Sequence, residues 1–126
     1  MALDFGEKRV GVASTDDSGE FALPRLTLPN DEYLLEAVLE FKRKEGIEKI
    51  IIGESKNFSG QPNSIMALIE DFKKKLEVVG VEVVFQPEIL TTMEARQIQG
   101  QTDLTDASAA ALILKSYLDT VYNKLV

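Results

Sequence analysis

Four acidic residues stand at the ends of elements that the sequence predicts, where carboxylates can do chemistry. Asp4 ends the first apolar run of the chain, although aspartate is a poor strand former. Glu54 follows the continuously apolar run 50–52, and Glu88 follows the β-rich run 81–85. Asp106 opens the last predicted helix. Because ligands of α/β sheets gather at the carboxyl ends of strands, we expect these acids on one rim.

Each of these acids also has a simpler explanation. Asp4 precedes a glycine turn, so a turn, a phosphate-binding loop and a metal ligand all remain open for it. Asp106 in a first helical turn interacts favourably with the helix dipole, and Glu88 after a strand is often merely solvated. Several carboxylates on one rim repel one another unless a cation joins them, and this shared placement favours a metal site.

The sequence contains no histidine and no cysteine. It therefore lacks the commonest general base, and it excludes disulfides, thiol catalysis and zinc-thiolate sites. Sites made only of carboxylates suit hard cations such as Mg²⁺ or Mn²⁺. Two such ions about 4 Å apart can activate a water and stabilise the leaving oxygen in phosphodiester hydrolysis.

The charge of the chain argues against nucleic-acid binding by bulk electrostatics. Its 14 basic and 21 acidic residues leave a net charge of −7, the wrong sign for such binding. Lys8 and Arg9 form a basic pair in the opening turn beside Asp4, where a functional role and surface solubility explain them equally well. The basic groups 42–44 and 73–75 lie on amphipathic helices and are best explained as solvated faces.

The elements that must position these residues follow the order βββαβαβα. Two apolar runs around Gly6 form an opening hairpin, and a third strand over 21–28 is an edge strand because Pro24 interrupts it. The first three strands pair antiparallel and the last two join by parallel crossovers, giving a five-stranded mixed sheet flanked by helices in one α/β domain, 1–126. The other expected elements are a helix over 31–45 capped by Asn30 or Asp31, a strand over 47–53, a helix from Ile65 to Gly80, a short helix opened by Thr91-Thr92, and a final helix capped by Thr105.

Bulk properties describe an ordinary globular protein. The chain has 126 residues, of which 44% are hydrophobic, enough for one sizeable core. No apolar run approaches the roughly 20 residues that span a bilayer, and no signal-peptide pattern opens the chain. With the absence of cysteine, these features lead us to expect a cytoplasmic protein and no membrane partner.

Four motifs together are similar to those of one known family. The opening run 3–13, Leu-Asp-Phe-Gly-Glu-Lys-Arg-Val-Gly-Val-Ala, resembles the first signature of the YqgF/RuvX family, Holliday-junction-resolvase-like nucleases of the ribonuclease H fold. Asn57–Gly60 resembles the family's loop after the fourth strand, and Glu88–Ala95 resembles its acidic motif. Asp106–Ala110 resembles the start of its final helix.

The resemblance implies a ribonuclease H-like fold and metal-dependent cleavage of nucleic acid. Bacterial members are linked to maturation of the 5′ end of pre-16S ribosomal RNA, so the implied partners are precursor rRNA or branched DNA. Resolution of a branched junction would need a homodimer, whereas an RNA-end nuclease can act as a monomer. The implied catalytic and Mg²⁺- or Mn²⁺-binding residues are Asp4, Glu88 and Asp106, and the implied nucleic-acid contacts are Lys8, Arg9, Asn57, Thr91 and Thr92.

Some positions depart from the family's pattern. The acidic motif usually reads Asp-Glu-Arg, whereas this chain has Pro87-Glu88-Ile89 and so lacks the arginine. Glu54 stands where relatives usually place an apolar residue, and we hypothesise that it supplements or replaces Glu88 as a metal ligand. Two alternatives to a nuclease therefore stay open: a ribonuclease H-like binding module without catalysis, and a phosphate or nucleotide binder of the actin/hexokinase type.

Overall fold

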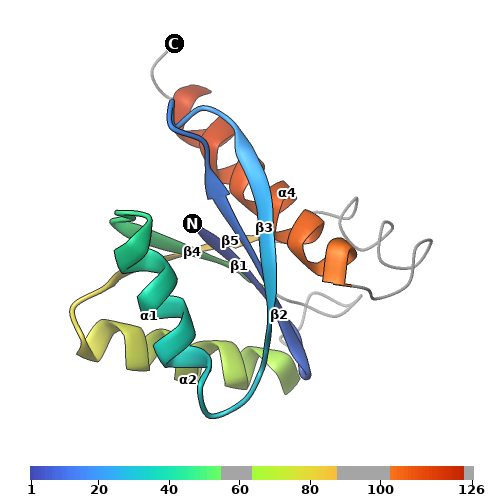
Figure 1. The fold of residues 1–126 in the computed structure, drawn as a ribbon, viewed down its shortest axis with the longest axis vertical. Coiled ribbons are helices and arrows are strands. Elements are labelled where there is room, and N and C mark those ends of the chain that lie inside the picture. The colour runs from blue at the N-terminus through green and yellow to red at the C-terminus, as the bar shows by residue number, and fades with distance from the viewer. Residues whose placement is uncertain (55–63, 88–102, 124–126) are drawn as a thin grey trace.

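The structure is a computed structural model that describes residues 1–54, 64–87 and 103–123. A central sheet is covered on one face by two helices and on the other face by a long third helix (Figure 1). The elements in chain order are β1 (Ala2–Phe5), β2 (Arg9–Thr15), β3 (Ala22–Pro29), α1 (Leu34–Lys44), β4 (Lys49–Glu54), α2 (Ser64–Val78), β5 (Glu82–Pro87) and α4 (Asp103–Asn123).

The sheet has the predicted mixed topology. Its strand order is β3-β2-β1-β4-β5. The first three strands pair antiparallel, and β4 is parallel to both β1 and β5. This confirms the α/β fold with a five-stranded mixed sheet and places β1, which carries Asp4, at the centre. As predicted, β3 is an edge strand, and a register shift opposite Val12 and Ala13 accompanies Pro24.

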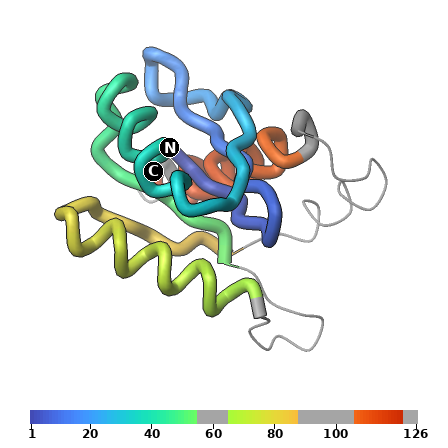
Figure 2. Tube along the Cα trace, turned by 60° about the horizontal axis from the view of Figure 1, so that its bottom comes forward, coloured from blue at the N-terminus to red at the C-terminus, as the bar shows by residue number. Residues whose placement is uncertain are grey.

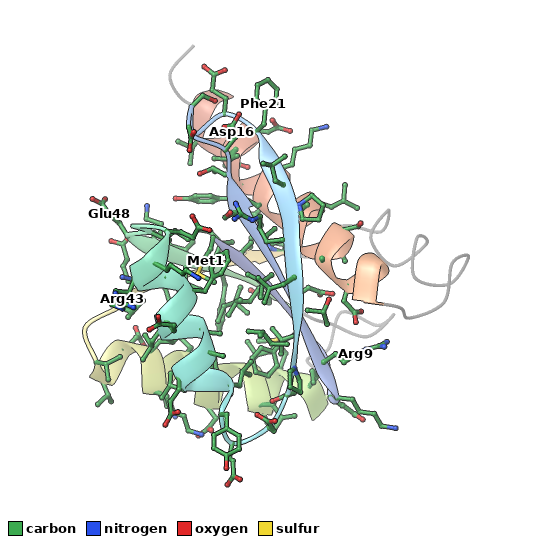
Figure 3. All side chains as sticks on the ribbon, viewed as in Figure 1. Met1, Arg9, Asp16, Phe21, Arg43 and Glu48 are labelled. Atoms are coloured by element: carbon green, nitrogen blue, oxygen red, sulfur yellow. The ribbon has the colours of Figure 1, made fainter. Side chains whose placement is uncertain are left out.

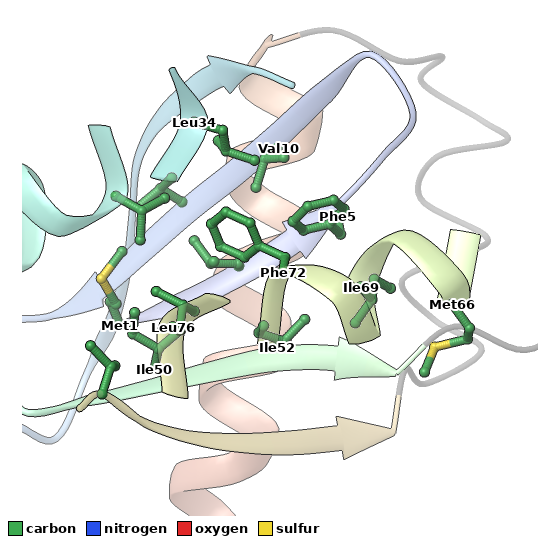
Figure 4. Close-up of a cluster of buried hydrophobic side chains, with 14 residues drawn as sticks. Met1, Phe5, Val10, Leu34, Ile50, Ile52, Met66, Ile69, Phe72 and Leu76 are labelled. Carbon is green, nitrogen blue, oxygen red and sulfur yellow. The ribbon is translucent and has the colours of Figure 1, made fainter. Parts of the chain in front are cut away.

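Side chains of different size fill the two faces of the sheet. Large residues such as Leu3, Phe5 and Ile52 pack against α1 and α2 (Figure 4), where the rings of Phe5 and Phe72 lie 5.2 Å apart. α2 runs beside β4 and β5 (Figure 2). The α4 face is built partly from small residues, Ala2, Ala13 and Ala110. Small side chains on both surfaces allow the backbone of α4 to approach the sheet closely.

Two helix starts differ from the prediction. α1 begins at Leu34 rather than 31, because Asp31 Oδ1 accepts a hydrogen bond from the Tyr33 N–H at 2.9 Å and holds a turn there. α4 begins at Asp103, so Thr105 lies inside the helix and is not its cap. Acidic residues favour a helix N-terminus, and Asp103 is as suitable there as a threonine cap. The helix predicted at Thr91-Thr92 lies outside the described residues.

The other described elements with predicted bounds begin and end within two residues of them. Gly46 and Gly80, the predicted stops of the first two helices, have φ of 65° and 84°. These left-handed conformations are typical of the glycine that follows a helix. Across the described ranges, no helix is both long enough and apolar enough to cross a membrane.

Candidate active site

Asp4 lies at the centre of the sheet on the face that α4 covers. Side chains alternate along a strand, and Ala2, two residues earlier, packs against α4. Gly11 lies directly opposite Asp4 on β2, and the β1–β4 register places Gly53 on its other side. Neither neighbour has a side chain to separate Asp4 from α4, although Asp4 itself is only 3% exposed.

Gly11 brings the first turns of α4 to the position beside Asp4. A Cβ atom on Gly11 would lie 2.0 Å from the carbonyl oxygen of Asp106 and 3.0 Å from the nitrogen of Ala107. Only a residue without a side chain fits there, so the helix backbone rests directly on β2. Residues opposite each other in an antiparallel pair share one face. Asp4 and Asp106 are therefore neighbours on this face, across Gly11.

The basic residue of this site is Arg9, also on β2. Its Nε lies 2.9 Å from Oδ2 of Asp106, and the two side chains are 34% and 8% exposed. An ionised carboxylate this deeply buried is costly without a positive partner, so the pair offsets part of that cost. Oδ2 of Asp106 nevertheless accepts no aligned hydrogen bond from any described residue. Figure 3 shows Arg9 at the far end of the sheet from Asp16 and Phe21.

The turn that carries Lys8 and Arg9 is braced from outside. The N–H of Asn30 donates to the Lys8 carbonyl at 2.9 Å, and its Nδ2 donates to the Gly6 carbonyl at 2.7 Å. Asn30, expected as a possible helix cap, instead fixes the opening hairpin. Lys8 is exposed on this turn.

This arrangement separates Glu54 from Asp4. Glu54 ends β4 in phase with Ile50 and Ile52, which pack against α1 and α2. Strand alternation therefore places Glu54 on the face opposite Asp4. Its predicted position at the carboxyl end of β4 is correct, but the sheet lies between it and the Asp4 carboxylate.

Glu88, Asn57, Thr91 and Thr92 lie outside the described residues. On β5, the strand before Glu88, Nε2 of Gln86 donates to Oγ of Ser116 on α4 at 3.1 Å. Within the ranges 1–54, 64–87 and 103–123, no group of three or more acidic side chains is placed to hold a metal ion.

A cavity of about 670 Å³ lies at the other end of the sheet, away from Asp4 and Asp106. Arg25 in its wall pairs with Glu45 at 2.6 Å and donates to Ser14. Lys49 donates to the hydroxyl of Tyr117 at 3.0 Å, and this bond raises the pKa of Lys49. The side chains of Arg25 and Lys49 are thus already paired within this wall, so the buried acids are the better candidate for chemistry.

Two residues that build the site, Gly11 and Asn30, were not assigned to it from the sequence. Gly11 carries a readable signal, because a glycine inside a strand often marks the close approach of another backbone. Asn30 carries none, because its two bonds join segments more than 20 residues apart.

Comparison with known proteins gives consistent matches over nearly the whole chain. The family model described as "RuvX: Holliday junction resolvase" matches residues 1–120. A relative from Caldanaerobacter subterraneus subsp. tengcongensis is 33% identical over 98% of this chain and 97% of its own length. One from Desulforudis audaxviator is 35% identical over 95% and 93%. Both relatives carry the name "Putative pre-16S rRNA nuclease".

Proposed function

This chain belongs to the RuvX family of Holliday junction resolvases, and from that membership we propose that it hydrolyses phosphodiester bonds with the aid of a divalent metal ion. The observation that carries the proposal is the placement of two nearly buried acidic residues: Asp4 lies opposite Gly11, and the backbone of Asp106 rests on Gly11. The names of the relatives favour the precursor of 16S rRNA as the substrate. Branched DNA is the second substrate to test.

The residues present fit a Mg²⁺ or Mn²⁺ ion. The donors are carboxylate oxygens, which such cations prefer. Oδ2 of Asp106 is buried and lies 2.9 Å from Nε of Arg9 but accepts no aligned hydrogen bond from the described residues, so its lone pairs are available to a metal ion. We propose Asp4, Asp106 and Glu88 as the ligands, and we leave out Glu54 because β4 turns it to the other face. When bound, the ion would activate water and stabilise charge on the leaving oxygen.

The other residues of the chain hold and orient the substrate in this proposal. Lys8 and Arg9 stand on a turn fixed by Asn30, so cationic groups meet the phosphate backbone from a defined position. Fixed local charges of this kind suit a chain whose net charge of −7 would otherwise repel nucleic acid. Asn57, Thr91 and Thr92 are proposed as further contacts to phosphate oxygens.

We propose that 1–126 acts as one ribonuclease H-like domain, which the match over residues 1–120 supports. Processing an RNA end needs one active site, which a monomer can supply. Cutting two symmetric strands of a junction needs a homodimer.

A cleavage assay with one matched control tests the proposal. Precursor 16S rRNA and a four-way DNA junction are incubated with Mg²⁺ or Mn²⁺ and with the wild type, Asp4→Asn or Asp17→Asn. Asp17 is exposed in the turn at the opposite end of the sheet, so its variant loses the same charge away from the site. We expect Asp4→Asn to lower the rate by about 10²-fold or more, since metal-assisted charge stabilisation supplies several kcal/mol.

The control should cleave like the wild type. Binding of either substrate in EDTA, with no cleavage by the wild type under any metal, would instead support a binding module. Thermal protection by Mg-ATP would support a nucleotide binder.

A further inference from the structure

Arg9 occupies the position where the proposed function needs a metal ion. Its Nε is 2.9 Å from Oδ2 of Asp106, whose side chain is only 8% exposed. A carboxylate this buried needs a positive charge nearby. A divalent cation bound to the same oxygen would supply that charge and would repel the guanidinium at such a distance. The two cations are therefore alternatives.

The Arg9 side chain can leave Asp106 while its main chain stays in place. The Arg9 carbonyl accepts a hydrogen bond from the Gly6 N–H at 2.9 Å, and Asn30 braces the same turn. The side chain, in contrast, is 34% exposed at the end of β2 (Figure 3). Breaking the pair would leave the Asp106 carboxylate uncompensated unless a second cation replaced the guanidinium, as a bound metal ion would.

The geometry of the contact leaves Asp106 able to bind a cation. Nε of Arg9 lies 2.9 Å from Oδ2 of Asp106, and Oδ2 accepts no aligned hydrogen bond from the described residues. The guanidinium therefore compensates the charge of Asp106, while the lone pairs of Oδ2 stay available to a cation.

We propose that Arg9 is a counter-ion of Asp106 that a divalent cation displaces, and that the released guanidinium then binds a substrate phosphate. Arg9 thus keeps the buried acids compensated before the metal binds and becomes a positioning residue for nucleic acid afterwards. The inference deepens the proposed function and rests on it for the identity of the ligand. It also assigns one residue both the predicted phosphate contact and the observed contact with Asp106.

The test is a titration of the protein with Mn²⁺ alone, followed by calorimetry without nucleic acid. We compare the wild type with Arg9→Gln, Arg9→Lys and the control Lys8→Gln, which removes the same charge from the neighbouring exposed position. We expect Arg9→Gln to bind Mn²⁺ about tenfold more tightly, or about 1.4 kcal/mol. Lys8→Gln should change the affinity by roughly twofold or less, as an exposed charge does.

Arg9→Lys keeps the charge, so its Mn²⁺ affinity should stay close to that of the wild type. Because it also changes the Arg9 side chain, it shows whether an altered affinity in Arg9→Gln comes from the lost charge or from a folding defect. In an Asp106→Asn background, Arg9→Gln should have no effect on Mn²⁺ affinity, because the carboxylate for which Arg9 and Mn²⁺ compete is gone. The melting temperature gives a second readout: Mn²⁺ should raise it more in Arg9→Gln than in the wild type.

Equal or weaker Mn²⁺ binding by Arg9→Gln would overturn the inference, and so would an equal gain in Lys8→Gln. The readout needs no cleavage, so the two proposals fail separately. A wild type that cleaves RNA, with no gain in Arg9→Gln, would refute the competition alone. A clear gain in Arg9→Gln, with no cleavage by the wild type, would refute the nuclease alone.

Discussion

Replacing Gly11 by alanine tests the contact on which the candidate site is built. The added Cβ would lie 2.0 Å from the carbonyl oxygen of Asp106, whereas ordinary van der Waals contact begins near 3.4 Å. The helix start must retreat by about 1.4 Å, because the atom it meets is backbone and cannot rotate away. Overpacking of this kind costs about 1–3 kcal/mol of unfolding free energy.

The same retreat moves Asp106 away from Asp4. Misplacing a catalytic group by about 1 Å can lower a rate by about 10²-fold. We therefore expect Gly11→Ala to lose about 1–3 kcal/mol in urea unfolding and, in addition, about 10²-fold in cleavage rate per folded molecule.

Val12→Ala is the matched control. Val12 is the next residue on the same strand, is fully buried, and packs on the other face, against the cluster that contacts α1 and α2. Loss of its two methyl groups should cost about 2 kcal/mol, with the rate per folded molecule unchanged. Comparing the two variants separates the effect of lower stability on the rate from the effect of moving Asp106.

A Gly11→Ala variant with the stability and the cleavage rate of the wild type would show that the contact between α4 and Gly11 does not position Asp106. An equal loss of rate per folded molecule in Val12→Ala would show the same, because the loss would then follow stability and not the position of Asp106.

Two further predictions concern residues away from this contact. Glu54→Gln should leave Mn²⁺ affinity unchanged in calorimetry, because strand alternation sets Glu54 on the face opposite Asp4; a weaker affinity would return it to the metal site. Lys49 has a pKa raised above 10.5, chiefly by its hydrogen bond to Tyr117, so its charge stabilises the fold below that pH and the benefit is lost as pH rises through the folded-state pKa. The urea midpoint of the wild type should therefore exceed that of Lys49→Met at neutral pH and converge with it at higher pH; a gap independent of pH would contradict this.

Much of the fold followed from local pattern. The alternating and continuous apolar runs predicted all five strands, and the glycines at 46 and 80 predicted where the first two helices end. Helix starts were less predictable. Residues such as Asp31 and Thr105 can cap a helix, but the same side chains also occur in turns and inside helices, so their presence does not fix the first helical residue. In the folded chain, the hydrogen bond from the Tyr33 N–H to Asp31 holds a turn before α1, and α4 begins at Asp103.

The sequence by itself determined that any catalysis by side chains uses carboxylates, hydroxyls, Lys or Arg, since it has no histidine or cysteine, and that Asp4 ends a strand. Tertiary structure alone decided which acids meet. The β1–β4 register turns Glu54 away, and a one-residue slip would have reversed its face. The close approach of α4 to Gly11 sets Asp106 beside Asp4, and Arg9 reaches Asp106 only because both stand over the same face of the sheet. These contacts join residues about a hundred positions apart, so their geometry exists only once the chain has folded.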